Sequence, residues 1–251
     1  AGAAWLVQSR LGNKALFLST CSPWLALGDI LIANYPFATI DPNVGIMPLS
    51  DPRLEKLSKY WQSKKTTLSV IEIVDIAGLV KGAAEGSGLG NEFLSHIREV
   101  DLICQVLRCF PEKEIVHVEK SVNPLRDLEI IQLELILADL QQVKRKLEKL
   151  KVRDEKSQKE KNILRLIQAN LEKEISVNQL SLTKGEKELI KGYNFLTNKP
   201  TLLLANYGGD KEEIKEMEKY AQEKQLFFFP LAVKIEREME KLTEGEKKEI
   251  S

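Results

Sequence analysis

Apolar residues gather in four short runs that are rich in β-branched or aromatic side chains. The runs span residues 68–78, 102–110, 201–206 and 226–233. Apolar residues fill successive positions rather than alternate ones, which is typical of strands covered on both faces of a mostly parallel sheet. Helical patterns fall between the runs, as at 90–100 and 210–224. This alternation predicts a doubly wound α/β layer.

The middle of the chain has a different pattern. No proline occurs between Pro124 and Pro200, and apolar residues recur there at spacings of three and four. One seam comprises Leu133, Ile136, Leu140, Val143, Leu147 and Leu150, and a second comprises Leu164, Ile167, Leu171 and Ile175. Both seams are typical of a coiled coil. With the charged stretch 151–161 as a solvated tip, they predict an α-helical hairpin over 127–196 that projects from the α/β layer. Two ordinary helices lying on the sheet are the alternative.

Composition excludes several classes of protein. The chain has 251 residues, with 37 Lys and Arg against 37 Asp and Glu, so no global basic field attracts nucleic acid or anionic lipid. The three cysteines are odd in number and lack paired metal spacing, which favours a reduced, cytoplasmic compartment. No apolar stretch approaches the roughly 20 residues of a membrane span. We therefore expect neither membrane insertion nor sequence-specific DNA binding.

The stretch at 75–78 reads DIAG and follows directly on a predicted strand. It fits a DxxG element, in which Asp75 holds Mg²⁺ through water and the Gly78 amide donates to a terminal phosphate. A flexible segment follows, containing Gly82, Gly86, Gly88 and Gly90. Such a segment can reorder when a phosphate binds, because glycine tolerates positive φ. A helix cap followed by a flexible turn is the alternative.

Several segments together resemble the YchF, or Obg-like ATPase, family. They are ANYPFATIDPNVG (33–45), DPRLEKL (51–57), VDIAGLVKGAAEGSGLGNEFLSHIREVD (74–101), RCF (108–110), IVHV (115–118), LELILADL (133–140) and YNFLTNKPTLLLAN (193–206). The resemblance implies a P-loop NTPase of the GTPase superfamily that uses ATP and Mg²⁺. It also implies a mostly parallel sheet interrupted by a helical coiled-coil hairpin.

The resemblance also implies a division into domains. We expect the nucleotide-binding domain to comprise residues 1–126 and 197–251, with the inserted hairpin at 127–196. In this family a small C-terminal TGS domain follows the nucleotide-binding domain. We expect this TGS domain to be absent from the chain, which would then be truncated at Ser251.

The resemblance assigns roles around the terminal phosphate. Thr39 and Asp75 match the residues that hold Mg²⁺, and Gly78 matches the amide donor. Leu79 stands where Ras-like enzymes place the glutamine that orients the attacking water. The family's candidate for that task is the histidine of IVHV, here His117, since a neutral imidazole accepts a hydrogen bond near pH 7. A surface histidine is the alternative.

A second group of residues is expected at the base. Asn206 resembles the base-reading asparagine, with Tyr207 and the backbone near Ala232 beside it. Guanine-specific relatives read NKxD there, and the family reads NxxE. This chain has Gly209 at the acidic position. Guanine selectivity is therefore weakly supported, and we expect ATP to bind better than GTP.

The phosphate-binding loop departs from its pattern. G-x-x-x-x-G-K-[ST] is required so that amides cradle the phosphates and the lysine reaches them. An ungapped match retains Gly12 but puts Val7 at the first glycine, Asn13 at the lysine and Lys14 at the hydroxyl, with Ala15 next. A one-residue insertion returns Lys14 to the lysine position and leaves Ala15 at the hydroxyl. Neither alignment restores the motif.

These observations predict a Mg²⁺-dependent ATP hydrolase of the YchF type that associates with ribosomes, with an impaired phosphate loop. Two alternatives remain open. One is a nucleotide-domain remnant that only binds. The other is a ribosome- or RNA-associated scaffold acting through the hairpin, whose basic residues between Lys144 and Lys161 could meet phosphates. Acidic residues are interleaved there, which favours an ordinary solvated surface.

Overall fold

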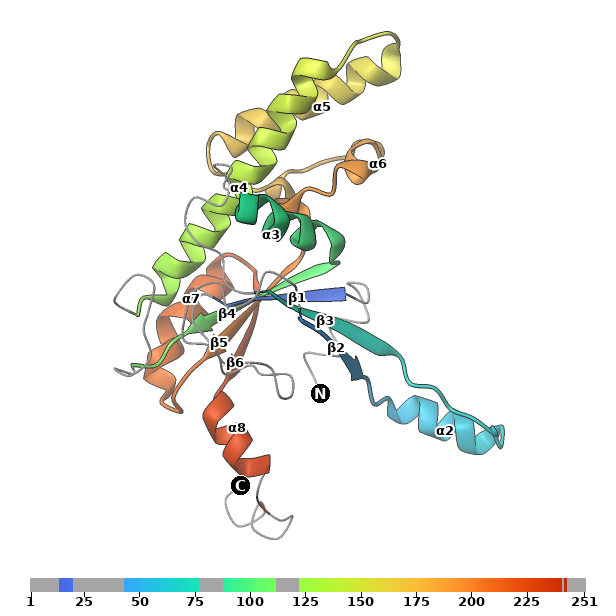
Figure 1. Cartoon of the computed structure of the whole chain (residues 1–251), viewed down its shortest axis with the longest axis vertical. Coiled ribbons are helices and arrows are strands. Elements are labelled where there is room, and N and C mark those ends of the chain that lie inside the picture. The colour runs from blue at the N-terminus through green and yellow to red at the C-terminus, as the bar shows by residue number, and fades with distance from the viewer. Residues whose placement is uncertain (1–13, 20–42, 77–87, 112–121, 241, 243–251) are drawn as a thin grey trace. The chain divides into compact units, whose positions relative to one another are not determined.

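A six-stranded sheet forms the centre of the fold in the computed structural model, which describes residues 14–19, 43–76, 88–111, 122–240 and 242. Its strand order is β2-β3-β1-β4-β5-β6 (Figure 1). The strands are β1 (Lys14–Ser19), β2 (Asn43–Pro48), β3 (Val70–Ile76), β4 (Leu102–Arg108), β5 (Thr201–Asn206) and β6 (Phe227–Leu231). Only β2 runs antiparallel to its neighbour. The predicted mostly parallel α/β fold is confirmed, and four of the six strands coincide with the four apolar runs.

The burial of the strands follows their place in the sheet. All seven residues of β4 are buried, because it lies between β1 and β5. Its side chains Leu102, Cys104 and Val106 share a core cluster with residues of β3 and β5. At one edge, β6 contains Pro230, which a strand tolerates where one side has no partner. The sequence analysis did not predict β1 or β2 as strands.

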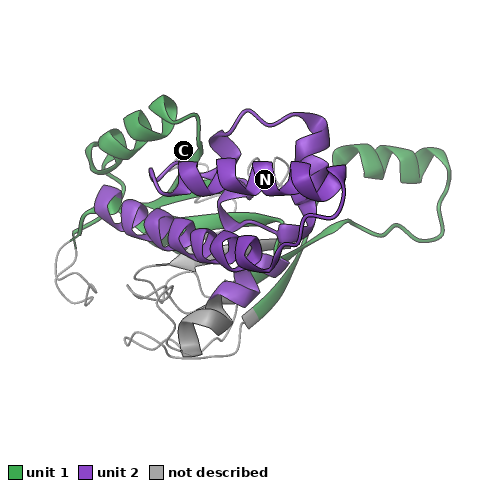
Figure 2. Ribbon diagram, turned by 90° about the horizontal axis from the view of Figure 1, so that it is seen from above, with its two compact units in different colours: residues 1–78, 100–124, 201–251 green, residues 79–99, 125–200 purple. Residues whose placement is uncertain are grey.

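The chain divides into two compact units, coloured in Figure 2. The first comprises residues 1–78, 100–124 and 201–251 and contains the whole sheet. It also contains α2 (Pro52–Tyr60), η5 (Lys211–Ile214), α7 (Lys215–Glu223) and α8 (Val233–Glu240). The second comprises residues 79–99 and 125–200. This division differs from the expected domains in two respects: α3 (Gly88–Glu99) groups with the inserted segment, and that segment spans 125–200 rather than 127–196.

The second unit contains the two predicted long helices, α4 (Pro124–Lys149) and α5 (Glu155–Leu171). A capping box between Asp154 and Ser157 begins α5, since it satisfies amides that the first turn leaves unpaired. Val143 of α4 and Leu164 and Ile167 of α5 are completely buried in one cluster. The expected seam is wrong at one position, because Leu133 is 40% exposed while its neighbours Glu134 and Leu135 are buried.

The hairpin is more than two helices. Residues 172–199 return along it as η2 (Val177–Gln179), α6 (Lys184–Ile190), η3 (Lys191–Tyr193) and η4 (Leu196–Asn198). Val177, Ile190 and Phe195 complete the same hydrophobic cluster. Tyr193 stacks on Phe195 and donates a hydrogen bond to Glu160 of α5. A two-helix coiled coil was therefore too simple a prediction, because a third segment closes its open face.

Candidate functional site

The carboxyl ends of β4, β5 and β6 form one continuous edge of the sheet. The Cys109 amide donates to the Asn206 carbonyl at 2.8 Å, and the Tyr207 amide donates to the Leu231 carbonyl at 3.2 Å. These bonds extend the strand ladders by one residue each. In open α/β sheets this edge is where ligands bind. The structure thus brings Asn206 and Tyr207 to the edge where the sequence placed them.

The Asn206 side chain is held in place at this edge. It is buried, and its Oδ1 accepts from the Val233 amide at 3.4 Å. Val233 begins α8 directly after Ala232, so Asn206 connects β5 to the segment that follows β6. Three of the predicted base-site residues, Asn206, Tyr207 and Ala232, therefore lie together. A fixed asparagine amide at this edge is the kind of group that can read the edge of a base.

Two glycines shape the loop after Asn206. The Gly208 amide donates to Oε2 of Glu213 at 2.6 Å, and a Cβ at Gly208 would lie 3.2 Å from the same oxygen. Gly209 has φ +117°, and a Cβ there would lie 2.8 Å from Cδ1 of Ile235. Position 209 therefore requires glycine both for its backbone conformation and for space.

An acidic side chain is present at this loop, but from another position. Glu213 of η5 reaches back to Gly208, whereas the sequence comparison expected the acid at Gly209. The sequence analysis did not single out Glu213. Its only signal is the acidic residues Asp210, Glu212 and Glu213 within one short stretch, and that pattern by itself is ordinary for a helix start.

The residues after β4 are packed against the same loop. Arg108 is buried, its Nε donates to the Phe110 carbonyl at 3.2 Å, and its guanidinium lies 4.9 Å from the Phe110 ring centroid. Burial raises the pKa of the Cys109 thiol to about 12, and the negative charge of Glu213 adds to this shift. Cys109 is therefore a structural thiol that stays protonated at neutral pH.

The DxxG element is described only at its start. Asp75 lies in β3, one residue before the strand ends, and pairs with Phe17 of β1 and Asn43 of β2. This position is at the carboxyl end of a parallel strand, as expected for an Mg²⁺ ligand in this fold. The other expected phosphate and water residues, Thr39, Gly78, Leu79 and His117, lie outside the described residues.

The structure does not support the expected position of the phosphate loop. Lys14 and Ala15 lie in β1, opposite Glu72 and Ile73 near the amino end of β3. They form a strand because the run KALFLS has parallel partners on both sides, β3 and β4. Gly12 and Asn13 lie outside the described residues.

In a P-loop the phosphate-binding segment follows its strand rather than preceding it. The segment between Ser19 and Ala33 contains one glycine, Gly28, and no lysine. The motif is therefore missing at this position as well.

Within the described part of the chain, no cluster of three His, Cys, Asp or Glu residues has the arrangement of a metal site. Among the same residues, no helix is both long enough and apolar enough to cross a bilayer.

Comparisons with known proteins identify the family to which this fold belongs. Residues 22–207 match the family model described as 50S ribosome-binding GTPase. The chain is 40% identical over 249 residues to the ribosome-binding ATPase YchF of Pasteurella multocida, covering 96% of this chain and 67% of that relative. It is 41% identical over 229 residues to the protein of the same name from Bacillus subtilis, covering 87% and 62%.

The chain belongs to the YchF family. The solved structure of the YchF GTPase of Schizosaccharomyces pombe superposes with a TM-score of 0.71 at 31% identity, over 96% of this chain and 71% of that one. The P-loop GTPase fold of this YchF chain is thus shown by sequence and by structure. The chain spans about two thirds of the length of the bacterial YchF relatives that it matches.

Proposed function

We propose that this YchF chain binds an adenine nucleotide with Mg²⁺ and associates with ribosomes in the cytoplasm. One observation carries the nucleotide proposal: Asn206 is buried and fixed at the carboxyl edge of the sheet, beside Tyr207 and Ala232. The names of the relatives, ribosome-binding ATPase and GTPase, support the same class of activity.

Adenine is the expected base. Guanine-specific members of the superfamily place an acidic side chain three residues after the asparagine, where it accepts from two guanine donors. Here that position is Gly209, whose backbone and surroundings exclude a side chain. Glu213, an acid at the same loop, already accepts from the Gly208 amide. GTP therefore loses a charge-assisted pair, which corresponds to roughly 1.5–3 kcal/mol, or one to two decades in affinity.

Mg²⁺ fits the oxygen chemistry of the residues proposed for it. Asp75 and Thr39 would hold the ion, which neutralises charge on the β- and γ-phosphates when bound. The Gly78 amide would donate to the γ-phosphate, and His117 would orient water because Leu79 cannot. The contribution of these residues is positioning and charge stabilisation rather than covalent chemistry.

A second candidate function is a binding module without turnover. It is favoured by one specific observation: Lys14 and Ala15 lie in β1, and no lysine occurs between Ser19 and Ala33. Without a lysine on the phosphates, the nucleotide loses a charge-assisted contact and is held less firmly. Misplacement of the reacting phosphate by about 1 Å can lower the rate of hydrolysis on the order of 10²-fold.

The deciding experiment compares three chains in Mg²⁺-dependent phosphate release. The first is this chain, the second carries G-x-x-x-x-G-K-[ST] rebuilt directly after Ser19, and the third carries the motif rebuilt within residues 4–15. We expect turnover to rise only in the second, since that loop lies at the carboxyl end of β1. Equal rates for the first and second chains would show that the phosphate loop does not limit this protein.

Nucleotide preference is measured separately by displacing a fluorescent ATP analogue. We expect ATP to compete at a concentration at least about tenfold below that of GTP. Displacement by GTP at the lower concentration would contradict the proposed base specificity. The Asn206→Ala substitution should weaken the binding of both ATP and GTP, because the side-chain amide that orients either base is lost.

Ribosome association is tested by cosedimentation of the chain with ribosomes. Part of the basic charge of the hairpin is engaged by acids, which makes the hairpin a weaker candidate for the contact than its composition indicates. Lys144 lies 3.5 Å from Glu172, and Lys159 lies 2.7 Å from Glu155. At these two lysines, little uncompensated charge is left for RNA phosphates.

A further inference from the structure

A solvent-exposed arm extends from the sheet between β2 and β3. We define the α2 arm as residues 50–68, which include helix α2. The Leu49 amide donates to the Ser69 carbonyl at 2.8 Å and closes the base of the arm. The hydroxyls of Ser58 and Thr66 lie 2.6 Å apart and join the helix to the returning segment. The arm is therefore an ordered structure and not a loose loop.

Packing does not account for helix α2. None of its residues is buried. It is held instead by local devices: Asp51 accepts from the Arg53 amide at 2.9 Å as the N-cap, and Pro52 follows at the first helical position. An ordered helix that covers no core is free to serve a surface function.

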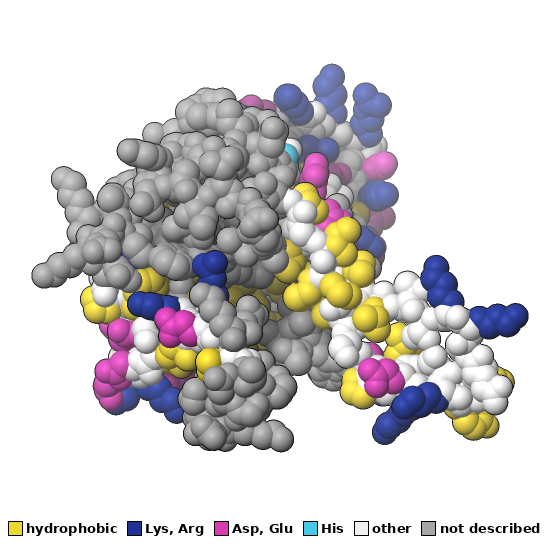
Figure 3. Space-filling model, turned by 60° about the horizontal axis from the view of Figure 1, so that its bottom comes forward, with side chains coloured by type: hydrophobic (Ala, Val, Ile, Leu, Met, Phe, Trp, Pro, Cys, Tyr) yellow, Lys and Arg dark blue, Asp and Glu magenta, His cyan; other side chains and the backbone are white. Residues whose placement is uncertain are grey.

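Two aromatic side chains stand at the end of this helix. Tyr60 is 78% exposed and Trp61 is 73% exposed. Their rings meet edge to face, with centroids 5.4 Å apart. Large aromatic side chains so open to water are uncommon on a monomer unless they mark a binding surface. Figure 3 shows this arm at the right, with hydrophobic and basic side chains on its surface.

The arm is also locally basic in a chain of zero net charge. Residues 50–68 hold five basic residues and two acidic ones. Arg53 is paired with Asp51 at 2.7 Å. The four lysines of the arm make no ion pair with any residue that the structure describes, whereas Lys144, Lys146 and Lys159 of the hairpin each lie within 4.0 Å of an acidic side chain. The lysines of the arm are Lys56, Lys59, Lys64 and Lys65.

We propose that the α2 arm binds unpaired segments of RNA. An exposed indole and phenol offer faces on which splayed bases stack, and the unpaired lysines meet the phosphates beside them. A protein partner fits less well, because interfaces between proteins are depleted in lysine, whereas those with nucleic acid are strongly basic. The inference rests on the proposed ribosome association only for the source of that RNA.

The test uses the whole chain and a fluorescein-labelled, unstructured RNA oligonucleotide, followed by fluorescence anisotropy. Trp61→Ala should weaken binding by about tenfold or more, and Trp61→Phe should restore most of it, because one stacked base is lost and then regained. Circular dichroism of each variant confirms that the fold is kept. Equal affinities of Trp61→Ala and the parent chain would overturn the proposal.

Charge is tested by the pair Lys64→Glu and Lys65→Glu against a control with the same change in net charge, Lys184→Glu with Lys187→Glu on exposed positions of α6. Affinity falls with salt, so the slope of log affinity against log salt is negative. The arm variant should make it less steep by about 1.4, since each phosphate contact to a single strand contributes about 0.7 to its magnitude. The control should leave the slope nearly unchanged. Equal slopes for the two variants would contradict the proposal.

Cosedimentation with ribosomes separates this inference from the proposed function. If the parent chain binds the oligonucleotide but not ribosomes, ribosome association fails and the RNA-binding arm stands. If the Trp61→Ala variant no longer cosediments with ribosomes while its affinity for the oligonucleotide is unchanged, the arm contacts a ribosomal protein and the proposal is wrong. If the parent chain does not bind RNA at all, the proposal is also wrong.

Discussion

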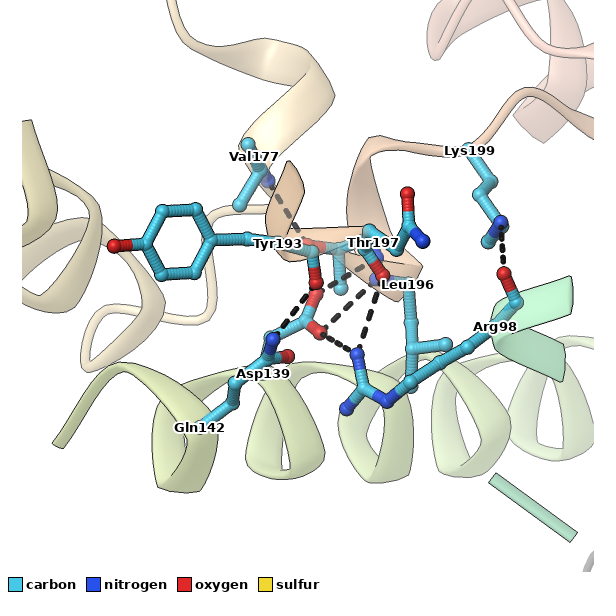
Figure 4. A network of polar contacts seen from close by, with 9 residues as sticks. Arg98, Asp139, Gln142, Val177, Tyr193, Leu196, Thr197 and Lys199 are labelled. Atoms are coloured by element: carbon cyan, nitrogen blue, oxygen red, sulfur yellow. Dashed lines mark hydrogen bonds and ion pairs between the residues drawn. The ribbon is translucent and has the colours of Figure 1, made fainter. Parts of the chain in front are cut away.

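Arg98 of α3 places its Nη1 3.7 Å from the carboxylate of Asp139, a completely buried residue of α4 (Figure 4). The same carboxylate accepts from the amides of Leu196 and Thr197 at 3.0 and 2.8 Å and from the Thr197 hydroxyl at 2.8 Å. Arg98 in turn donates to the Asn194 carbonyl at 3.2 Å. One buried acid thus joins α3, α4 and the η3–η4 segment into the second unit.

Asp139→Asn should destabilise the chain. An amide in place of the carboxylate turns one acceptor into a donor, so at least one buried amide of Leu196 or Thr197 loses its partner. Each unsatisfied buried donor costs about 1–3 kcal/mol, and we expect a loss of about 2–4 kcal/mol in the free energy of unfolding. Urea denaturation followed by circular dichroism measures it. Glu188→Gln, the same chemical change at an exposed position, should stay within about 0.5 kcal/mol. Equal effects of the two substitutions would refute this role.

The stability of the second unit should depend on pH through Asp139. Burial raises the pKa of this carboxyl, and the hydrogen bonds and Arg98 oppose that shift only in part. The folded state therefore binds the proton more tightly than the unfolded state. The stabilisation from this group is full below the unfolded pKa of about 4 and is lost as pH rises through the higher folded pKa.

A comparison of variants isolates that pH dependence. The parent chain should exceed Asp139→Asn in stability by more at low pH than at neutral pH. Asp154 provides a control of opposite sign, because hydrogen bonds from Ser157 hold its pKa below the usual value. The stabilisation that Asp154 contributes is present above its unfolded pKa and is lost as pH falls through its lowered folded pKa. Urea midpoints from pH 3 to pH 8 would show both trends, and parallel curves for the parent chain and Asp139→Asn would contradict the assignment.

Two glycines should respond to alanine in opposite directions. Gly209 has φ +117°, and an added Cβ would lie close to Ile235, so Gly209→Ala should lower the free energy of unfolding by about 1–3 kcal/mol. Gly185 lies in α6, where an added Cβ would meet no neighbouring atom within 4 Å, so Gly185→Ala should raise the free energy of unfolding by about 0.5–1 kcal/mol. Thermal unfolding of both variants measures the difference. A stable Gly209→Ala variant with unchanged nucleotide affinity would show that the loop tolerates a side chain.

Two cysteines should resist thiol reagents until the chain unfolds. Burial raises the pKa of Cys104 and of Cys109 to about 12, and both side chains are enclosed by the sheet core or by the residues next to it. In a Cys21→Ser background, a chromogenic disulfide reagent at pH 8 should find no reactive thiol in the native protein. In concentrated guanidinium chloride it should find both. Fast reaction of either thiol in the native state would mean that this edge of the sheet opens readily.

Local patterns in the sequence were enough to predict most regular elements. The contiguous apolar runs became β3, β4, β5 and β6, and in β4, which has a strand on each side, every residue is buried. The three-and-four spacing became α4 and α5, although α5 begins at Glu155, inside the charged stretch 151–161 that was expected to be a solvated tip. The family segments placed Asn206 correctly at the end of a strand. Each of these features depends on residues that are close together along the chain.

Tertiary structure decided the rest. The short run at Lys14–Ser19 becomes a strand because β3 and β4 pair with it on both sides, and this placement removes Lys14 and Ala15 from the expected phosphate loop. The carboxylate at the glycine loop comes from Glu213, and the burial of Asp139 depends on a segment more than fifty residues away. Tyr60 and Trp61 are large aromatic residues, yet both side chains are mostly exposed in the part of the chain that the structure describes. Pairing and burial depend on which distant residues meet, and no local pattern records that.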